Sequence, residues 1–295
     1  MESARLPRQA LSPARTNVAL IVALLLLAAI GWAVTDERMR GMDAGPGTDP
    51  GSLGFYVTAW VVMMAAMMFP SIYPMVATFA RIQEGKRERG EQVPIGITAV
   101  FVGGYLAIWT LVGLLAYAIF DLGRSLSIDA LSWDRAGPYV AGGVIAAAAI
   151  YQLTSLKNAC LVRCRSPLAF LLGSYRPGRL GALRMGLEHG GWCVGCCWAL
   201  MAALFALGVM SVGWMVFIAA LIATEKLLPW KAVANRGIAV LLVVLGVAVA
   251  FAPDSVPGLT LPDSAEARSA MDAMEMEGGS MEPAPAESID DRVEP

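Results

Sequence analysis

Charged residues are scarce in this chain. Asp, Glu, Lys and Arg together make up 16% of its 295 residues, against roughly 25% in a soluble globular protein. Hydrophobic residues make up 57% of the chain. This composition argues against an ordinary soluble domain and indicates an integral membrane protein.

Motifs for nucleotide hydrolysis are also missing. No G-x-x-x-x-G-K-[ST] sequence occurs, so an ATP-driven pump within this chain is not expected. The chain has one histidine and five cysteines. We expect a metal-handling or transport protein rather than an enzyme, and we expect no nucleic-acid partner.

Seven apolar segments are long enough to cross a bilayer, which takes about 20 residues of helix. We therefore predict an all-α, polytopic membrane protein with seven spans. Six spans is the fallback, because the last two segments are short. The first segment exceeds the apolar core of a cleaved signal peptide, so we expect it to be retained. The predicted spans are residues 17–34, 54–80, 95–119, 137–155, 187–210, 212–228 and 236–252.

The distribution of Lys and Arg predicts how these spans are oriented. With residues 1–16 in the cytoplasm, sixteen of the 22 basic residues fall in inner segments. This places the N-terminus inside, the transmembrane domain at 17–252 and the C-terminus outside. The expected location is the cytoplasmic (inner) membrane of a bacterium, with the lipid bilayer as surroundings.

Residues 253–295 have a composition typical of disorder. From Asp254 onward this tail holds eleven acidic and two basic residues and almost no apolar run. It is predicted to be disordered and extracytoplasmic. Thioether sulfur is a soft ligand suited to Cu(I). The alternative is that these methionines bind no metal, because a flexible tail tolerates methionine at any position. The outer methionines are Met39 and Met42 in the first outer loop, and Met271, Met274, Met276 and Met281 in the tail.

The stretch "HGGWCVGCCWALM", residues 189–201, concentrates metal-binding side chains in the fifth predicted span. On a helix, His189 and Cys193 are four residues apart, and Cys196 or Cys197 follows on the same face. Nitrogen and sulfur ligands at these spacings suit Cu(I) or Zn(II). The alternative is that buried free cysteines pack as small hydrophobic residues. The same stripe continues in both directions with Met185 and Met201.

Three glycines in this span leave room for another helix to approach: Gly190, Gly191 and Gly195. If the span enters the membrane near Gly186, its ligands lie in the cytoplasmic half. Cys160 and Cys164 follow the fourth span in a cytoplasmic connection. There Arg163 and Arg165 flank Cys164 and favour the thiolate that binds metal. Structural disulfides are not expected in this reducing compartment.

The second predicted span, "VVMMAAMMFPSIYPMV", is rich in methionine and contains two prolines. Pro70 and Pro74 each remove a backbone donor and are predicted to break or kink the helix. Irregular helices of this kind often carry substrate or ion sites. The alternative is a methionine-filled core beside a proline kink. The candidate ligands are Met63, Met64, Met67 and Met68, with Met75 as an accessory residue.

Charged residues inside predicted spans are candidates for function. Glu188 precedes His189 and is a candidate to orient it, and Glu225 is the better candidate for an intramembrane acid. Lys226 is expected to extend to the interface, with its charge in water.

Four blocks together resemble a known family: "MMAAMMFPSIYPM", "YQLTSLKNACLVRCRSPL", "GALRMGLEHGGWCVGCCWALM" and "EKLLPW". They are similar to the bacterial family of predicted metal-binding integral membrane proteins, a domain of unknown function, over residues 55–232. The resemblance implies metal binding. The residues it marks are Met63, Met64, Met67, Met68, Pro70, Pro74, Cys160, Cys164, His189, Cys193, Cys196 and Cys197.

Three functions remain open at this point. The first is handling or inward movement of a soft metal, with Cu(I) expected and Zn(II) as the alternative, from weak thioethers to strong thiolates. The second is thiol–disulfide exchange by Cys193 and Cys196, a C-x-x-C pair. The third is a non-catalytic assembly partner that passes metal to a membrane metalloenzyme. A metallochaperone is a further expected partner, and the oligomeric state stays open.

Overall fold

The structure is a computed structural model that describes residues 13–40, 43, 45, 51–125, 133, 135–228, 230–261, 264, 265, 267–269 and 272. Within these residues it is all-helical, without strands. The helices are α1 (Pro13–Met39), α2 (Leu53–Glu88), α3 (Ile97–Ser125), α4 (Gly137–Gln152), α5 (Ser155–Arg165), α6 (Pro167–Ser174), α7 (Gly178–Leu207), α8 (Val212–Leu227) and α9 (Lys231–Phe251), followed by the 3-10 turn η2 (Pro253–Ser255).

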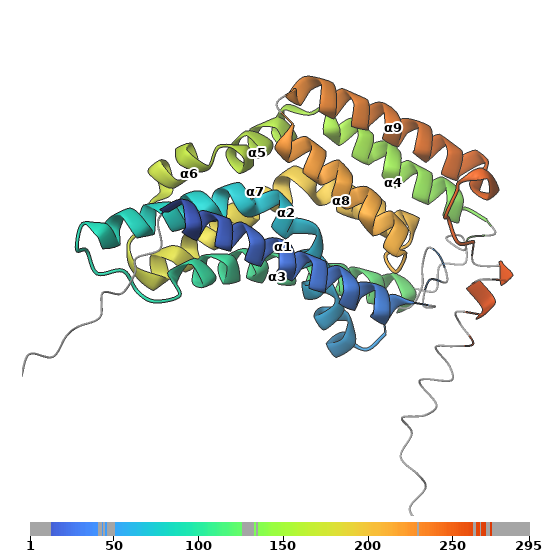
Figure 1. Ribbon diagram of the computed structural model, residues 1–295. Helices are drawn as coiled ribbons and strands as arrows, with labels where there is room; N and C mark the ends of the chain where they lie inside the picture. Colours follow the sequence, from blue (N-terminus) through green and yellow to red (C-terminus); the bar gives the residue numbers. More distant parts are fainter. Residues whose placement is uncertain are drawn as a thin grey trace, which may run out of the picture.

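The long helices run back and forth along one common direction (Figure 1). The start of α1, the connection from α2 to α3, and the turn between α6 and α7 lie at one end, on the left of Figure 1. The end of α3, the turn between α7 and α8, and the end of α9 lie at the opposite end. The basic residues near the first end include Lys86, Arg87, Arg176, Arg179 and Arg184.

Within the described part of the chain, five helices are long and apolar enough to cross a membrane: α1, α2, α3, α7 and α9. A sixth span results if α4 and α5 are counted as one bent unit. Helix α8 coincides with the sixth predicted apolar segment but has only 16 residues. Each predicted span therefore overlaps a helix. The number of membrane crossings, seven, and the orientation of the chain stay predictions.

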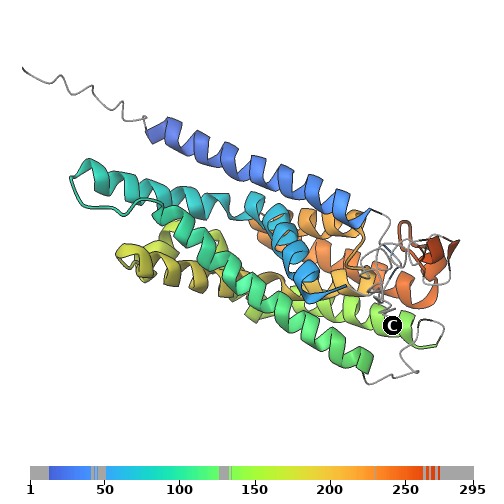
Figure 2. The ribbon, with the colours of Figure 1, turned by 90° about the horizontal axis from the view of Figure 1, so that it is seen from below.

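Helix α2 continues through both of its prolines. Ser52 caps its N-terminus by accepting a hydrogen bond from the backbone N–H of Phe55 at 3.4 Å. Pro70 and Pro74 lie inside the helix, which changes direction partway along its length (Figure 2). The predicted irregularity therefore takes the form of a bend rather than a break.

Helices α4 and α5 meet at a bend of 68°. Leu153 ends α4, and Thr154 caps α5 by accepting a hydrogen bond from the backbone N–H of Lys157 at 3.2 Å. Residues that sequence reasoning assigned to a plain connection therefore form the helix α5. The bend directs α5 against α7 and α8, and this contact builds the candidate site.

Glycines permit the close approach of α3 and α7, one of the most extensive helix contacts in the structure. A Cβ atom added to Gly186 would lie 2.1 Å from the carbonyl oxygen of Phe101, and one added to Gly190 would lie 3.0 Å from Ile108 Cβ. A Cβ atom added to Gly191, by contrast, would meet no atom of another described element within 4 Å. Of the three glycines predicted to admit another helix, Gly190 does so for α3 and Gly195 for α5, whereas Gly191 does not. Gly186 is a further point of close approach that was not predicted.

Residues 253–261, which the composition assigned to the disordered tail, are packed in this structure. Trp214 donates from Nε1 to the carbonyl oxygen of Gly258 at 2.9 Å, and Thr260 donates to Asp43 at 3.0 Å. Val256 and Leu259 are buried. The N-terminal residues 1–12 and most of the tail lie outside the described residues, as do the candidate ligands Met42, Met271, Met274, Met276 and Met281.

Candidate metal centre

Three thiols from two helices converge between α5 and α7. The Sγ atoms of Cys164 on α5 and of Cys193 and Cys196 on α7 all lie within 4.8 Å of one another. Cys196 Sγ lies 3.7 Å from Cys164 Sγ. We call these three residues the thiol cluster. Cys193 and Cys196 are buried and Cys164 is half-buried.

The missing side chain at Gly195 lets α5 reach α7. A Cβ atom at this position would lie 2.7 Å from Cys160 Sγ, closer than non-bonded atoms pack. Helix α4 is tied to the same point, because the Tyr151 hydroxyl donates to the carbonyl oxygen of Gly195 at 2.5 Å. Cys164, one turn after Cys160, is thereby held beside Cys196.

Cys160 and Cys197 are buried near the thiol cluster without belonging to it. Cys197 donates its S–H to the carbonyl oxygen of Cys193 at 3.0 Å, a bond within its own helix. Cys160 packs against Gly195. Of the five candidate cysteines, the structure therefore brings three together and gives the other two packing contacts.

Two polar side chains from other helices contact Cys193. Lys226 of α8 donates from Nζ to Cys193 Sγ at 2.9 Å and to Ser71 Oγ of α2 at 3.3 Å. The Tyr105 hydroxyl of α3 lies 3.1 Å from the same sulfur. Lys226 is only 9% exposed, so it does not extend to an interface as the sequence led us to expect.

The cation beside the thiol cluster is therefore Lys226 rather than an arginine of α5. Arg163 lies over the Trp192 ring at 3.9 Å, and Arg165 donates to the carbonyl oxygens of Glu225 and Leu228. Sequence reasoning missed Lys226, Tyr105 and Ser71 as neighbours of the cluster. A lysine in an apolar segment was a usable signal for the first, and the position of Ser71 beside Pro70 in the irregular second span was a signal for the third. Tyr105 carried none.

Glu225 forms a buried ion pair that joins α8 to α5. Its Oε1 accepts from Lys157 Nζ at 2.6 Å and from Gln152 Nε2 at 2.6 Å. The side chains of Lys157 and Glu225 are each 1% exposed. Glu225 is thus an acid buried inside the helix bundle, and it holds the helix that carries Cys164.

His189 lies apart from the three thiols, in a box of aromatic rings. Its ring centroid is 5.4 Å from that of Phe170, 5.9 Å from Tyr105 and 6.2 Å from Phe101. The side chain is 1% exposed, and its Nδ1 has no hydrogen-bond partner among the described residues. A buried imidazole nitrogen without a partner is rare and leaves His189 free to bind a ligand. Its link to the thiol cluster is Tyr105, which touches both.

Glu188 has partners other than His189. Its Oε1 lies 3.3 Å from Arg176 and 3.7 Å from Arg184, and the side chain is about a third exposed. The structure thus shows it in surface ion pairs at the basic end of α7. Cys193 lies near the middle of the 30-residue α7.

The methionines of α2 are all buried in the bundle. We call Met63, Met64, Met67 and Met68 the methionine segment; each has 2% exposure or less. Ser71 follows the segment in α2. Its hydroxyl donates to the carbonyl oxygen of Met68 at 2.8 Å and accepts from Lys226, which also contacts Cys193. Other methionines buried in the same core are Met39, Met75, Met185, Met201, Met210 and Met215.

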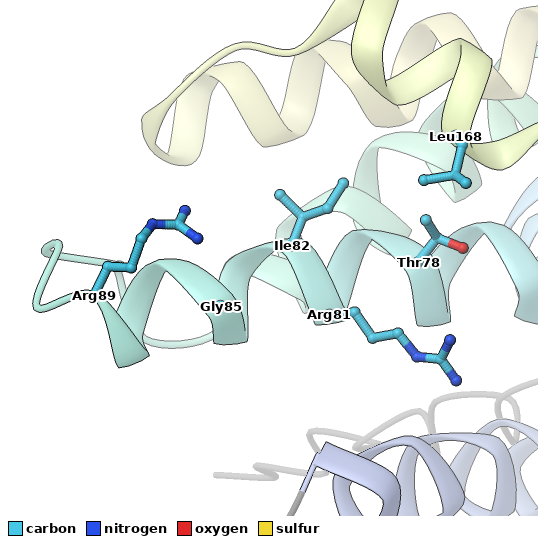
Figure 3. A pocket seen from close by; sticks show the side chains of 6 residues that line it. All are labelled: Thr78, Arg81, Ile82, Gly85, Arg89 and Leu168. Carbon is cyan, nitrogen blue, oxygen red and sulfur yellow. The ribbon is translucent and has the colours of Figure 1, made fainter.

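A separate cleft of about 370 Å³ opens between α2 and α6. It is lined by Thr78, Arg81, Ile82, Gly85, Arg89 and Leu168 (Figure 3). None of the candidate metal ligands lines it. The candidate centre is therefore packed inside the bundle and is distinct from this basic surface cleft.

The spacing of the three sulfur atoms suits a trigonal thiolate site. A metal–sulfur distance of about 2.3 Å requires sulfur atoms roughly 4.0 Å apart around a trigonal ion. In the structure the sulfur atoms of Cys196 and Cys164 are 3.7 Å apart, and no pair in the cluster is separated by more than 4.8 Å. Three soft ligands favour Cu(I) or Zn(II) over hard cations. The fold and the site together define a helical protein with candidate membrane spans and a buried cluster of thiols that could hold a soft metal ion.

The comparison with protein families agrees with this class. The family model of the PpoB2 copper chaperones matches residues 57–249, and the chain belongs to this family. The match includes the methionine segment, all five cysteines, His189 and the Lys157–Glu225 ion pair. No curated protein and no solved structure matches the chain.

Proposed function

We propose that this protein is a membrane-embedded copper-handling protein that binds Cu(I) at the thiol cluster. The observation that carries the proposal is the convergence of the Cys164, Cys193 and Cys196 sulfur atoms within 4.8 Å inside a copper chaperone family fold. Thiolates bind Cu(I) strongly, and a buried site protects the ion from exchange with water. Copper is here the cargo of the protein.

The methionine segment is the proposed approach route for copper. Its neutral thioethers bind Cu(I) weakly and bind divalent ions poorly. Ser71 connects the segment to Lys226 and Cys193. Copper that passes from thioethers to thiolates therefore moves toward stronger ligands. His189, one helical turn before Cys193 and with an unpartnered Nδ1, is the proposed next ligand along α7.

The proposed setting is a bacterial inner membrane with the N-terminus inside. The length and apolar character of α1, α2, α3, α7 and α9 support this setting. In this orientation the basic end of the bundle faces the cytoplasm, and the acidic tail with its methionines faces outward. The tail is the proposed capture segment, and the inward direction of copper movement follows from the order of the ligands.

The proposed recipient is a protein outside this chain, either a soluble metallochaperone or a membrane metalloenzyme that needs copper. Membership in a copper chaperone family supports delivery to another protein. A buried thiol cluster needs a recipient ligand to enter the bundle or a change in helix packing before copper can leave.

The metal content of purified cysteine variants tests the proposal. The full-length protein is loaded with Cu(I) without oxygen, and bound copper is measured by elemental analysis. Cys193→Ser with Cys196→Ser, and Cys164→Ser alone, should lower bound copper, because serine is similar in size but a hard ligand. Cys197→Ser and Cys160→Ser are matched controls, since both residues are buried beside the cluster but outside it.

Two outcomes contradict the proposal. If the thiol cluster variants keep the copper content of the parent protein, these thiols are not the site. If Cys197→Ser and Cys160→Ser lose as much copper as the cluster variants, the loss reflects disturbed packing rather than lost ligands. Circular dichroism and gel filtration of each variant check that the helical fold is retained.

Thiol–disulfide exchange is the second candidate function, favoured by the 3.7 Å separation of Cys164 and Cys196. The reaction transfers a disulfide from a partner protein to these two cysteines and leaves two thiols on the partner. Differential alkylation and mass spectrometry of the protein under oxidising conditions should then find a Cys164–Cys196 disulfide. Persistence of both free thiols would remove this candidate.

A further inference from the structure

The ammonium group of Lys226 is buried against a ligand of the thiol cluster. Nζ lies 2.9 Å from Cys193 Sγ. Within the described residues, no carboxylate forms an ion pair with it, because the neighbouring Glu225 pairs with Lys157. A buried ammonium is costly unless an opposite charge lies close to it. The carboxylate of Glu225 acts on Lys226 from beyond ion-pair distance, and a thiolate at Cys193 would supply a negative charge at 2.9 Å.

A fixed positive charge acts differently on monovalent and divalent metal ions. Three thiolates that hold Cu(I) carry one more negative charge in total than the same three thiolates holding Zn(II). An ammonium beside one of these sulfur atoms therefore stabilises the Cu(I) centre more than the Zn(II) centre. Donor softness alone does not provide this discrimination, because thiolates bind both ions well.

We propose that Lys226 is a specificity-determining residue that favours Cu(I) over Zn(II) at the thiol cluster. This inference rests on the proposed function, because it takes the cluster as the copper site. It adds a selection by charge at the thiolates to the selection by ligand softness in the methionine segment. An incoming divalent ion meets about twice the repulsion from Lys226 that Cu(I) meets.

The distances set the size of the effect. Nζ is 2.9 Å from the sulfur, so a metal bound about 2.3 Å from that sulfur lies roughly 5 Å or less from the ammonium. A difference of one unit charge at about 5 Å, with an effective dielectric constant of about 20, corresponds to an affinity ratio on the order of 100-fold. The measured quantity is the ratio of the Cu(I) and Zn(II) affinities, in which packing effects common to both metals cancel.

Tyr105 offers a matched control at the same sulfur. Its hydroxyl lies 3.1 Å from Cys193 Sγ and carries no charge. Tyr105→Phe removes one hydrogen-bonding group while the ammonium of Lys226 stays in place. The substitution should therefore weaken the binding of both metals by similar factors and leave their affinity ratio within about threefold of the parent ratio.

The experiment titrates the purified full-length protein with each ion at one pH against a competing chelator of known affinity. The parent protein, Lys226→Met, Lys226→Gln, Lys226→Arg and Tyr105→Phe are compared. Both neutral replacements of Lys226 should lower the Cu(I)/Zn(II) affinity ratio by at least about tenfold, and up to about 100-fold. Lys226→Arg keeps the positive charge and should retain most of the selectivity.

The outcomes separate this inference from the proposed function. If the parent protein binds Cu(I) at the thiol cluster and the ratio is unchanged in Lys226→Met and Lys226→Gln, the inference is overturned while the copper site stands. An equal loss of selectivity in Tyr105→Phe and the neutral variants would also overturn it, because hydrogen bonding rather than charge would then be responsible. A parent protein that binds no Cu(I) would overturn both.

Discussion

Removing one member of the Lys157–Glu225 ion pair should destabilise the protein far more than removing both. The side chains are each 1% exposed, and their charged atoms lie 2.6 Å apart. Glu225→Gln leaves a buried ammonium without its partner, and Lys157→Met leaves a buried carboxylate. Each single substitution should cost about 3–5 kcal/mol, because an unpaired charge remains in a medium of low dielectric constant.

The double variant tests the physical reason for this cost. With Lys157→Met and Glu225→Gln combined, neither charge of the pair remains, and the Gln152 amide can still donate to the new amide oxygen at position 225. The cost of the double variant should therefore be smaller than that of either single variant, which gives a strongly non-additive cycle. A cost equal to the sum of the two single costs would refute the assignment of a coupled, buried pair.

Thermal unfolding in detergent provides the measurement. The chain contains eight tryptophans, so intrinsic fluorescence can follow unfolding without a label. Each kcal/mol corresponds to roughly 2–4 °C in a chain of this size, so the single variants should unfold roughly 6–20 °C below the parent. Because Lys157 and Cys164 share α5, the single variants should also bind less copper than the double variant.

Three further predictions concern helix packing, the copper route and topology. Gly186→Ala should destabilise the protein by about 1–3 kcal/mol in the same thermal assay, because its Cβ would lie 2.1 Å from the Phe101 carbonyl oxygen. Gly191→Ala is the control and should not destabilise it, because the added methyl group has open space. Replacing the whole methionine segment by leucine costs under about 1.5 kcal/mol per site and should lower copper loading of a partner in cells while the purified thiol cluster still binds Cu(I). Unchanged loading would show that these methionines only pack the helix. A reporter fused after Pro295 should be active only outside the cytoplasm, and cytoplasmic activity would reverse the proposed direction.

Composition and periodicity were enough to predict the helical class of the protein and its apolar segments. Each predicted span coincides with a helix, because an apolar run of that length has few other ways to satisfy its backbone in lipid. The spacing of Cys193 and Cys196 likewise predicted that they lie close together, since helix geometry decides which residues of a single helix are neighbours. The family expected from four sequence blocks handles metal, as the copper chaperone match shows.

The membership of the thiol cluster depended on contacts between helices. Spacing along α7 favoured His189 and Cys197 as much as Cys196, but the structure places His189 in an aromatic box and leaves the Cys197 sulfur outside the group of three thiols. The third thiol comes from α5, which was not predicted as a helix. Its position follows in part from the 68° bend after α4, which leaves no periodic signal in the sequence. It also follows from the close approach at Gly195, one of the three glycines predicted to admit a neighbouring helix.

Lys226 illustrates the same division between sequence and tertiary structure. A lysine near the end of an apolar segment can extend to water or turn inward, and its position in the chain does not distinguish the two. In the folded protein, the sulfur of Cys193 and the hydroxyl of Ser71 lie within reach of its ammonium. The sequence therefore determined which chemical groups each helix carries. Tertiary packing decided which of them meet, because helix periodicity relates residues within one helix and carries no information on the rotation or depth of its neighbours.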